Sequence, residues 1–417
     1  MAVRVFLRTF GCRANQYDSE SVAAMVVAGG GTLVPRVEDA DVAVFNSCAV
    51  TAEAEADLRQ QLRRAARRAP EIRSVVMGCA AARSGPQLAA LPGVAAVIGG
   101  ADLDAIGAAL GLDVATRVAG GTTQRGTRGL LRIQDGCDEH CTFCATTLAR
   151  GASRSRDIAT LVDEATTLAA RHPEIVLTGI HIGTYGRDTG TTLAALVAAL
   201  VVAVPSVRFR LTSIEATEVD EPLAELLTAD ARRVAPHLHA PLQSGSDAVL
   251  RRMGRHWYDA ARYASAVEGL TRRATGAFAL GADLITGFPG ETDADHRATC
   301  ALVERLPFTS LHVFPYSPRP GTAALRLGHE VPADVRRARA AELRTIGADR
   351  AAAHAQSRIG FAADVIVIGD ADGTRHGLTE DYLTVELASP APARGTRFAA
   401  LLGTGVSPLR PVAIPTA

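Results

Sequence analysis

The chain has 417 residues, a formal net charge of zero at neutral pH, and 44 basic side chains that are all Arg, since no Lys occurs in it. This balance argues against a nucleic-acid binder that relies on a broadly basic surface. Seven cysteines are too few for a disulfide scaffold of this length, which favours a reducing cytoplasmic setting and a metal or redox role for them. The length predicts two or three domains.

The first region, residues 1–121, alternates short β-rich runs with helical patterns. The runs VRVFLRTFGC, DVAVFNSCAV and RSVVMGCA lead to Cys12, Cys48 and Cys79. Strands that alternate with helices predict a parallel α/β sheet, in which the carboxyl ends of the strands meet at one edge. We therefore expect three thiols to gather at one rim, the alternative being three buried free cysteines.

The second region, residues 122–355, repeats the alternation six times. The strand candidates are GLLRIQDG, EIVLTGI, VRFRLTSIE, HLHAPLQSG, ALGADLITGFPG and SLHVFPYSP. This repeat predicts a partly or fully closed α/β barrel with its site at the carboxyl ends of the strands. The apolar run 193–204 is too short to cross a bilayer and predicts a buried helix, and the N-terminus has no secretory signal. We expect no membrane contact.

The third region, residues 356–417, has short alternating runs separated by Gly and Asp turns. Such a pattern predicts a small antiparallel β-barrel.

Three cysteines lie within eight residues in the stretch IQDGCDEHCTFC, at Cys137, Cys141 and Cys144. Soft thiolate ligands suit zinc or an iron–sulfur cluster. Structural zinc needs four ligands, but no fourth Cys is near and His140 adjoins Cys141 too closely. Three thiolates on a four-iron cluster would leave one iron open to a substrate, which is the reading that we favour.

This loop, with Phe143 before its last cysteine, resembles the radical S-adenosylmethionine (SAM) superfamily. The motifs FGCRANQYDSE, FNSCAV and MGCAA resemble the N-terminal domain of the methylthiotransferases. The resemblance extends over nearly the whole chain and implies two [4Fe-4S] clusters, one on the three loop cysteines and one on Cys12, Cys48 and Cys79. It also implies a C-terminal module similar to the RNA-contacting TRAM domain.

Within that family, IQDGC, LTGIHIGTYG and HVFPYSPRPGT look most like the branch that acts on threonylcarbamoyladenosine in tRNA. The implied reaction adds a methylthio group to C2 of the modified adenine beside the anticodon. One SAM would donate a methyl group and a second would yield the radical. The implied partners are tRNA, SAM, an electron donor and a sulfur source.

Four alternatives stay open at this point. Two are other branches, which act on isopentenyladenosine in tRNA or on an aspartate of a ribosomal protein. The other two are a radical SAM methyltransferase without sulfur insertion and a non-catalytic iron–sulfur protein.

Other motif residues are weaker candidates for cofactor binding. Gly179 could offer backbone groups to SAM, and Glu215 could accept a hydrogen bond from its ribose or ammonium, unless Glu215 is a helix N-terminal carboxylate. Arg156, with its neighbours Arg150 and Arg154, could clamp the SAM carboxylate or an RNA phosphate, or belong to a solvated loop. In the PLQSGS turn, Gln243 and Ser244 could face the barrel mouth. The alternative is a turn whose polar groups are all hydrogen-bonded within the protein.

Two arginine groups are candidates for RNA contact. A helical stretch of the first region carries Arg59, Arg63, Arg64, Arg67 and Arg68, for which a solvated charged face is the favoured reading. In the third region the candidates are Arg375, His376 and Arg397, with packing as the alternative because that region is net acidic.

Overall fold

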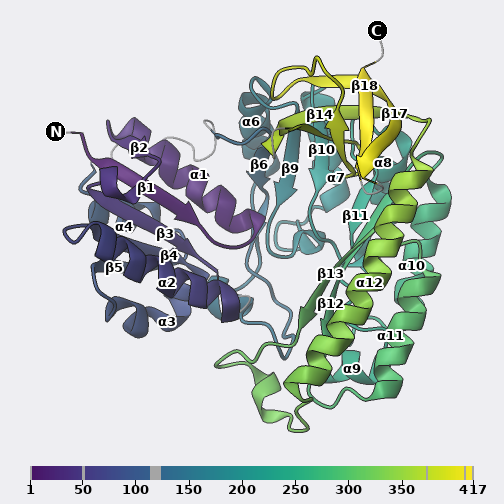
Figure 1. Ribbon diagram of the computed structural model, residues 1–417, viewed down its shortest axis with the longest axis horizontal. Helices are drawn as coiled ribbons and strands as arrows, with labels where there is room; N and C mark the ends of the chain where they lie inside the picture. Colours follow the sequence, from purple (N-terminus) through teal and green to yellow (C-terminus); the bar gives the residue numbers. More distant parts are fainter. Residues whose placement is uncertain (1, 49–51, 113–123, 372–373, 408–409, 416–417) are drawn as a thin grey trace.

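The computed structural model describes residues 2–48, 52–112, 124–371, 374–407 and 410–415. Figure 1 shows an N-terminal α/β region beside a large curved sheet with outer helices, and a small β-barrel over one end of that sheet. No described helix combines the length and the apolarity needed to cross a membrane. The predicted boundary at 121/122 falls outside the described residues.

The N-terminal region contains five parallel strands in the order β2-β1-β3-β4-β5. The strands are β1 (Arg4–Thr9), β2 (Thr32–Val34), β3 (Val42–Ser47), β4 (Arg73–Gly78) and β5 (Val94–Gly99). The helices are α1 (Arg13–Ala28), η1 (Val37–Asp39), α2 (Ala52–Arg68), α3 (Cys79–Ala89) and α4 (Leu103–Leu110). The predicted parallel sheet is thus confirmed.

Alternating side chains of the central strand β3 bury both faces of this sheet. Val42 and Val44 pack with residues of α1 and α4, whereas Ala43 and Phe45 pack with residues of α2 and α3. Because strand side chains alternate between faces, an unbroken apolar strand requires cover on both sides.

The barrel of the second region is built from six strands in two three-stranded parallel sheets. They are β6 (Gly129–Arg132), β9 (Glu174–Thr178), β10 (Arg208–Leu211), β11 (His237–His239), β12 (Ala279–Thr286) and β13 (Ser310–Pro315). Isolated bridges from Phe209 to Val234 and from Ser213 to His239 join the two sheets. The six predicted strands are all present, and they form a partial barrel.

Helices cover the outer face of this partial barrel (Figure 1). They are α6 (Ile158–Ala169), α7 (Leu193–Ala203), α8 (Glu221–Ala229), α10 (Ala260–Arg273), α11 (Asp293–Arg305) and α12 (Ala333–Ser357). Shorter elements are β7 (Gln134–Asp135), α5 (Thr146–Arg150), β8 (Arg154–Ser155), η2 (Ile182–Thr184), η3 (Ala216–Glu218), α9 (Asp247–Arg252) and η4 (Ala323–Arg326). The apolar run 193–204 forms the buried helix α7, as predicted.

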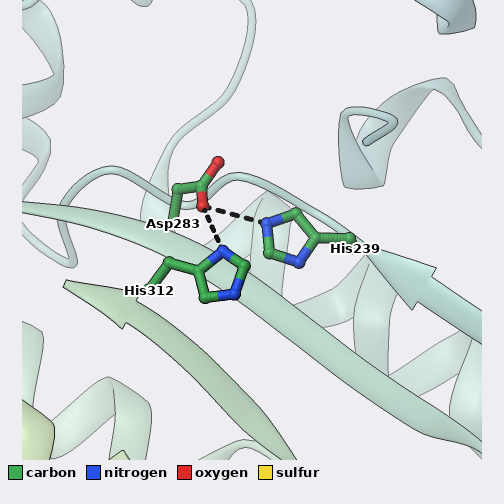
Figure 2. Close-up of side chains that lie close together, drawn as sticks. All are labelled: His239, Asp283 and His312. Carbon is green, nitrogen blue, oxygen red and sulfur yellow. Dashed lines mark hydrogen bonds and ion pairs between the residues drawn. The ribbon is translucent and has the colours of Figure 1, made fainter. Parts of the chain in front are cut away.

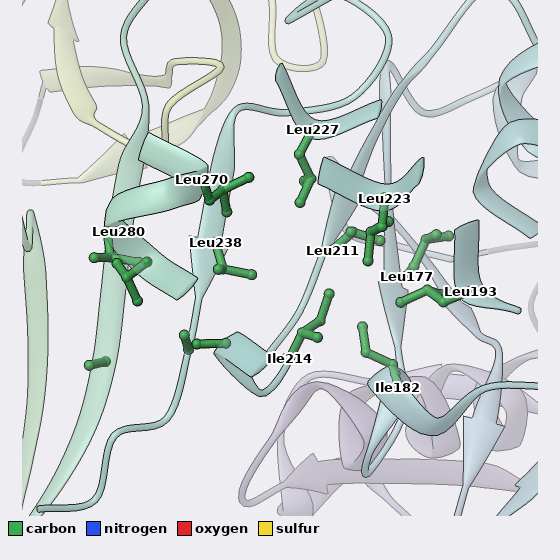
Figure 3. Close-up of a cluster of buried hydrophobic side chains, with 14 of the residues drawn as sticks. Leu177, Ile182, Leu193, Leu211, Ile214, Leu223, Leu227, Leu238, Leu270 and Leu280 are labelled. Atoms are coloured by element: carbon green, nitrogen blue, oxygen red, sulfur yellow. The ribbon is translucent and has the colours of Figure 1, made fainter. Parts of the chain in front are cut away.

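The largest hydrophobic core lies between the strands and these helices. Figure 3 shows strand residues Leu177, Leu211 and Leu280 facing helix residues such as Leu223 and Leu270. Because one face of each strand enters this core, the next residue along the strand points to the inner, concave face of the barrel.

The C-terminal region is a closed five-stranded barrel in the order β14-β15-β16-β18-β17. The strands are β14 (Ala362–Ala371), β15 (Thr374–Leu378), β16 (Thr384–Leu387), β17 (Arg397–Ser407) and β18 (Arg410–Pro415). The expectation of a purely antiparallel barrel is wrong at one pair, because β16 and β18 run parallel. A closed ring with an odd number of strands cannot alternate direction throughout, so at least one pair must be parallel.

This small barrel covers the amino-terminal ends of the large barrel's strands. Arg208 and Arg210 each pair with the fully buried Glu174, at 2.7 and 2.9 Å. Arg208 also binds Asp364 of β14 at 3.0 Å, and Tyr382 stacks on His237 with ring centroids 4.6 Å apart. The contacts close that end of the large barrel.

Candidate functional site

Cys12, Cys48 and Cys79 each follow a strand of the N-terminal sheet. Cys12 precedes α1 directly after β1, Cys48 follows β3, and Cys79 is the first residue of α3. A Cβ added at Gly11, whose φ is +111°, would lie 2.7 Å from the Cβ of Cys48. Only a glycine lets the loop before Cys12 approach Cys48 this closely. The predicted common rim is therefore formed.

A buried amide pair fixes the backbone beneath this rim. Asn15 and Asn46 are the only two asparagines of the chain. The Asn15 side chain donates to Oδ1 of Asn46 at 2.9 Å, and Asn46 donates back to the Asn15 carbonyl at 2.7 Å. The Cys12 thiol lies 3.3 Å from Oδ1 of Asn15. Sequence reasoning missed this pair, although the rarity of Asn was a usable signal.

The second cysteine trio lies on the loop between β7 and α5, which distant elements hold in place. The Thr142 N–H donates to the Met253 carbonyl at 2.8 Å, and Phe143 packs edge-on against Phe288 with centroids 6.2 Å apart. A Cβ at Gly136 would lie 1.9 Å from the Ala152 carbonyl oxygen, so the loop requires glycine there. Phe143 thus supports the loop through packing.

Each sulfur of this loop has a polar neighbour. Cys137 Sγ lies 3.5 Å from Nδ1 of His181, and Arg255 donates to Cys141 Sγ at 3.6 Å. The backbone N–H of Thr146 donates to Cys144 Sγ at 3.3 Å. Burial raises the pKa of Cys141 to about 12, although Arg255 opposes the shift. These donors suit sulfurs that carry negative charge once a metal is bound.

The donor sets fit clusters better than single ions. Within the described part of the chain, the residue groups with ligand atoms all within 4.8 Å of one another include neither cysteine trio. A single tetrahedral zinc with bonds of about 2.3 Å would draw its sulfurs closer than that. In each trio at least one pair of sulfurs is therefore more than 4.8 Å apart, too far for both to bind one zinc ion as they stand.

Glu215 and Arg255 form a buried pair beside Cys141. The Arg255 guanidinium donates to Oε1 of Glu215 and, at 2.7 Å, to the Tyr258 hydroxyl. Burial raises the pKa of Glu215, and Arg255 works against that shift. Oε2 of Glu215 is buried and has no hydrogen-bond partner among the residues that the structure describes. An unpaired buried carboxylate oxygen is costly, so this atom is available to a ligand donor.

Gly179 lies directly after β9, where the side chain of Gln134, from β7, contacts the loop that follows. Gln134 Oε1 accepts from the N–H groups of Ile180 and His181, at 3.0 and 2.9 Å. A Cβ at Gly179 would lie 2.7 Å from the Gln134 carbonyl oxygen. The glycine therefore lets the two loops touch, which supports its predicted place at the site.

His181 is a further residue that sequence reasoning missed. Its Nε2 lies 2.9 Å from Glu218. Burial favours the neutral ring, but the hydrogen bonds to Cys137 and Glu218 outweigh burial and raise the pKa of His181 to about 10. A cationic imidazole therefore faces the sulfur of Cys137.

Arg150 joins the two cysteine trios. It extends from α5, directly after the second trio, and its Nε donates to Cys79 Sγ of the first trio at 3.3 Å. Its other nitrogens pair with Asp18 at 2.8 Å and Asp135 at 3.0 Å, and the residue is 8% exposed. The solvated-loop reading is wrong for Arg150, which is buried between the regions, whereas Arg154 is exposed.

Arg156 lies away from the sulfurs. Its guanidinium pairs with Glu164 at 2.7 Å, reaches the Tyr17 hydroxyl at 3.4 Å and donates to the Arg132 carbonyl at 2.7 Å. These contacts hold α1 against the barrel. A role of Arg156 in cofactor binding stays a prediction, and its partners favour packing.

The remaining candidates are mostly engaged within the protein. Ser244 is buried and lies 3.3 Å from the Thr299 hydroxyl, which favours the satisfied turn. In the C-terminal barrel, Arg375 pairs with Asp370 at 2.7 Å and Arg397 pairs with Asp364 at 2.5 Å, while His376 is buried. These contacts favour packing over RNA contact.

One arginine-lined hollow lies on the N-terminal region. A cavity of about 620 Å³ is lined by Arg64 and Arg68 of α2 together with Arg8 and Arg36, and Glu38 is its single acidic residue. The helix face predicted to be solvated thus contributes two arginines to a concave surface. Such a surface suits an anionic partner.

Comparisons with known proteins find two family matches along the chain. Residues 4–100 match the model of an uncharacterized protein family, UPF0004, and residues 131–303 match the radical SAM superfamily. The threonylcarbamoyladenosine tRNA methylthiotransferase MtaB of Thermotoga maritima is 36% identical over 79% of this chain and 78% of its own length. The tRNA-2-methylthio-N(6)-dimethylallyladenosine synthase of Acidithiobacillus ferrooxidans is 34% identical over 88% and 86%.

Among solved structures, the radical S-adenosylmethionine methyltransferase TsrM from Kitasatospora setae is similar in fold. The TM-score is 0.58 at 14% identity, over 78% of this chain and 77% of that chain. At this identity the likeness concerns the fold alone.

Proposed function

Since the chain belongs to the family of the threonylcarbamoyladenosine tRNA methylthiotransferases, we propose that it adds a methylthio group to C2 of N6-threonylcarbamoyladenosine beside the anticodon. It is a radical SAM enzyme of tRNA modification. The observation that supports this assignment is the contact of Arg150, which follows the second trio on α5, with the sulfur of Cys79 in the first trio. Sulfur insertion requires two such centres to act on one substrate atom.

We assign one [4Fe-4S] cluster to Cys137, Cys141 and Cys144, and a second to Cys12, Cys48 and Cys79. The radical SAM domain supports the first, and the UPF0004 match supports the second. With SAM bound, the first supplies one-electron chemistry that can break an aromatic C–H bond, which acid–base groups cannot do.

The residues of the chain bind and orient the reactants. We propose that Oε2 of Glu215 accepts a hydrogen bond from the ammonium or ribose of SAM, because no group in the described part of the chain donates to this buried oxygen. Arg255 holds Glu215 and Cys141 in a fixed relation, since it donates to both. The backbone at Gly179 lies against Gln134 of β7, directly before the cysteine loop.

The partners follow from the reaction. The substrates are tRNA and SAM, and the reaction also needs an electron donor and a sulfur source. We propose the cytoplasm as its place, because tRNA is modified there. The cavity that Arg8, Arg36, Arg64 and Arg68 line is our candidate for contact with RNA phosphates.

A second candidate substrate is isopentenyladenosine in tRNA. The observation that favours it is the 34% identity to the dimethylallyladenosine synthase, only slightly below that of the first relative. Mass spectrometry of tRNA nucleosides distinguishes the two substrates.

The test expresses the chain in a bacterial host that lacks both of its own tRNA methylthiotransferases. Cys300 on α11 is the one cysteine outside both trios, so Cys300→Ser is the matched control. We expect the methylthio form of threonylcarbamoyladenosine to appear with the parent chain and with this control, and to be absent with Cys141→Ala. Methylthio-isopentenyladenosine instead would move the assignment to the second candidate. Neither product, from a chain that carries about 8 iron atoms, would contradict both.

A further inference from the structure

Two histidines and one aspartate converge inside the partial barrel, apart from both cysteine trios. His239 lies on β11, Asp283 on β12 and His312 on β13, so three adjacent strands supply one residue each. Asp283 is the register partner of His312, and His239 is the partner of Gly281, two residues before Asp283 on the same face of β12. Figure 2 shows both rings directed at the carboxylate.

This face is the inner face of the barrel. The alternate residues of β12, Leu280, Ala282 and Leu284, are fully buried in the core against the outer helices. Asp283 therefore points to the concave side. It lies four residues after the start of β12 and three before its end, about halfway along the strand.

The strands provide room for the His239 ring. A Cβ at Gly281 would lie 2.5 Å from Nδ1 of His239 and 2.8 Å from Oγ of Ser310. Any other residue at position 281 would displace the imidazole. The absence of a side chain there sets the ring position beside the carboxylate of Asp283.

The three ligand atoms lie within 4.8 Å of one another, and the two distances to the carboxylate are those of a metal site. Nε2 of His239 lies 3.0 Å and Nδ1 of His312 lies 3.2 Å from the same oxygen, Oδ1 of Asp283. For a metal with bonds of about 2.05 Å, neighbouring ligands are about 2.9 Å apart in an octahedron and about 3.3 Å apart in a tetrahedron. Both measured distances lie within this range.

The site remains open to a further ligand. The exposed fractions of the side chains of His239, Asp283 and His312 are 12%, 27% and 61%. The exposed side of His312 therefore gives an ion and its remaining ligands access to the group.

We propose that His239, Asp283 and His312 bind a divalent first-row transition-metal ion on the inner face of the barrel. Two imidazoles and one carboxylate suit zinc, iron(II) or manganese(II), and three protein ligands leave positions for water or an anionic oxygen. This site does not depend on the identity of the tRNA substrate. It is separate from the cluster sites, because none of its ligands is a cysteine.

Zinc is the probe, because added iron could not be told apart from cluster iron. The cluster-loaded chain is used, so that iron already occupies the six site cysteines. A Cys300→Ser background removes the thiol of a second small group, His296, Cys300 and Glu342, which could also take an ion. Zinc and iron are then measured together by mass spectrometry after anaerobic dialysis against Zn²⁺.

We expect about one zinc per chain in this background, and less than about one tenth of that after Asp283→Asn or His312→Gln is added. Gly281→Ala, which leaves all three ligands in place, should lower the zinc content by displacing His239. Iron should stay at about 8 per chain in every variant, which shows that the fold and clusters are intact. No zinc in the background chain, or equal zinc in the Asp283→Asn variant, would overturn the proposal.

Discussion

The two cysteine trios of this molecule are built in different ways. Cys12, Cys48 and Cys79 come from three separate strand ends, and the backbone of one parallel sheet sets their spacing. Cys137, Cys141 and Cys144 share one loop, whose position depends on side chains of other strands and helices. The first site is therefore as rigid as its sheet, whereas the second depends on contacts that are distant in sequence.

The largest expected effect separates the trios by function. Cys141→Ala should abolish reductive cleavage of SAM, whereas Cys79→Ala should retain cleavage and lose only the methylthio product. Each variant should hold about 4 iron atoms rather than about 8. The assay measures 5′-deoxyadenosine and the modified nucleoside in the same reaction. Loss of SAM cleavage in a folded Cys79→Ala variant would show that the trios do not act separately.

The next largest effect tests the connection between the trios. Arg150→Gln removes the cation that Asp18 and Asp135 share and leaves the buried carboxylate of Asp18 with Arg132 alone. We expect the free energy of unfolding to fall by about 3 kcal/mol, since two charge-assisted hydrogen bonds of a buried guanidinium are lost. Chemical denaturation measures this change. Arg154→Gln, on the exposed neighbour, should change stability by less than about 0.5 kcal/mol.

A smaller effect concerns the attachment of the C-terminal barrel. Burial would raise the pKa of Asp381, but His354 and Arg358 of the preceding helical segment lower it from 3.8 to about 2. Because the folded pKa is depressed, this stabilisation is complete above about pH 4 and is lost as the pH falls towards 2. Asp381→Asn should cost about 2 kcal/mol at pH 7.

The difference in unfolding free energy between the parent and Asp381→Asn should therefore shrink in acid. Asp349→Asn, an exposed change on α12, is the matched control and should show no such trend. A difference that stays constant from pH 7 to pH 3 would mean that the charge of Asp381 does not stabilise the fold.

The smallest effect tests how the second trio depends on distant residues. Glu215→Gln keeps the shape but removes the charge opposite Arg255 and weakens the free acceptor Oε2. We expect the KM for SAM to rise about tenfold, equivalent to about 1.4 kcal/mol, with iron content unchanged. Glu221→Gln, at an exposed ion pair, should leave the KM unchanged. An unchanged KM in Glu215→Gln would remove this residue from the SAM site.

The sequence predicted the elements well because their signals are local. Apolar runs that end at cysteines gave the N-terminal sheet, and six strand patterns gave the barrel. The C-x3-C-x2-C spacing is visible in the sequence itself. The rim of three cysteines was predictable because each cysteine follows a strand of the same parallel sheet. The parallel pair β16–β18 was not predictable from residue patterns, because it follows from the closure of five strands.

The supporting residues of the site were harder to predict. Arg255 acts on Cys141 from 114 positions away, and Arg150 reaches Cys79 from 71 positions away. No local pattern encodes such pairs, because the fold alone brings them together. His181 shows the same limit, since its high pKa depends on both Cys137 and Glu218. Arg156 was expected at the cofactor, but its partners are at the junction with α1.

Because Tyr382 helps to close one end of the large barrel, an RNA that contacts both the C-terminal barrel and the cysteine loop must span the length of the large barrel. Tyr382 stacks on His237, which is the register partner of Ala279 at the start of β12. From Ala279 to Thr286, the last residue of β12, there are seven residue steps. At about 3.3 Å per step, this separates the C-terminal barrel from the rim of the cysteine loop by about 23 Å. A single nucleoside cannot bridge that length. The C-terminal barrel can therefore influence the binding of a folded RNA while leaving the chemistry on one base to the opposite end.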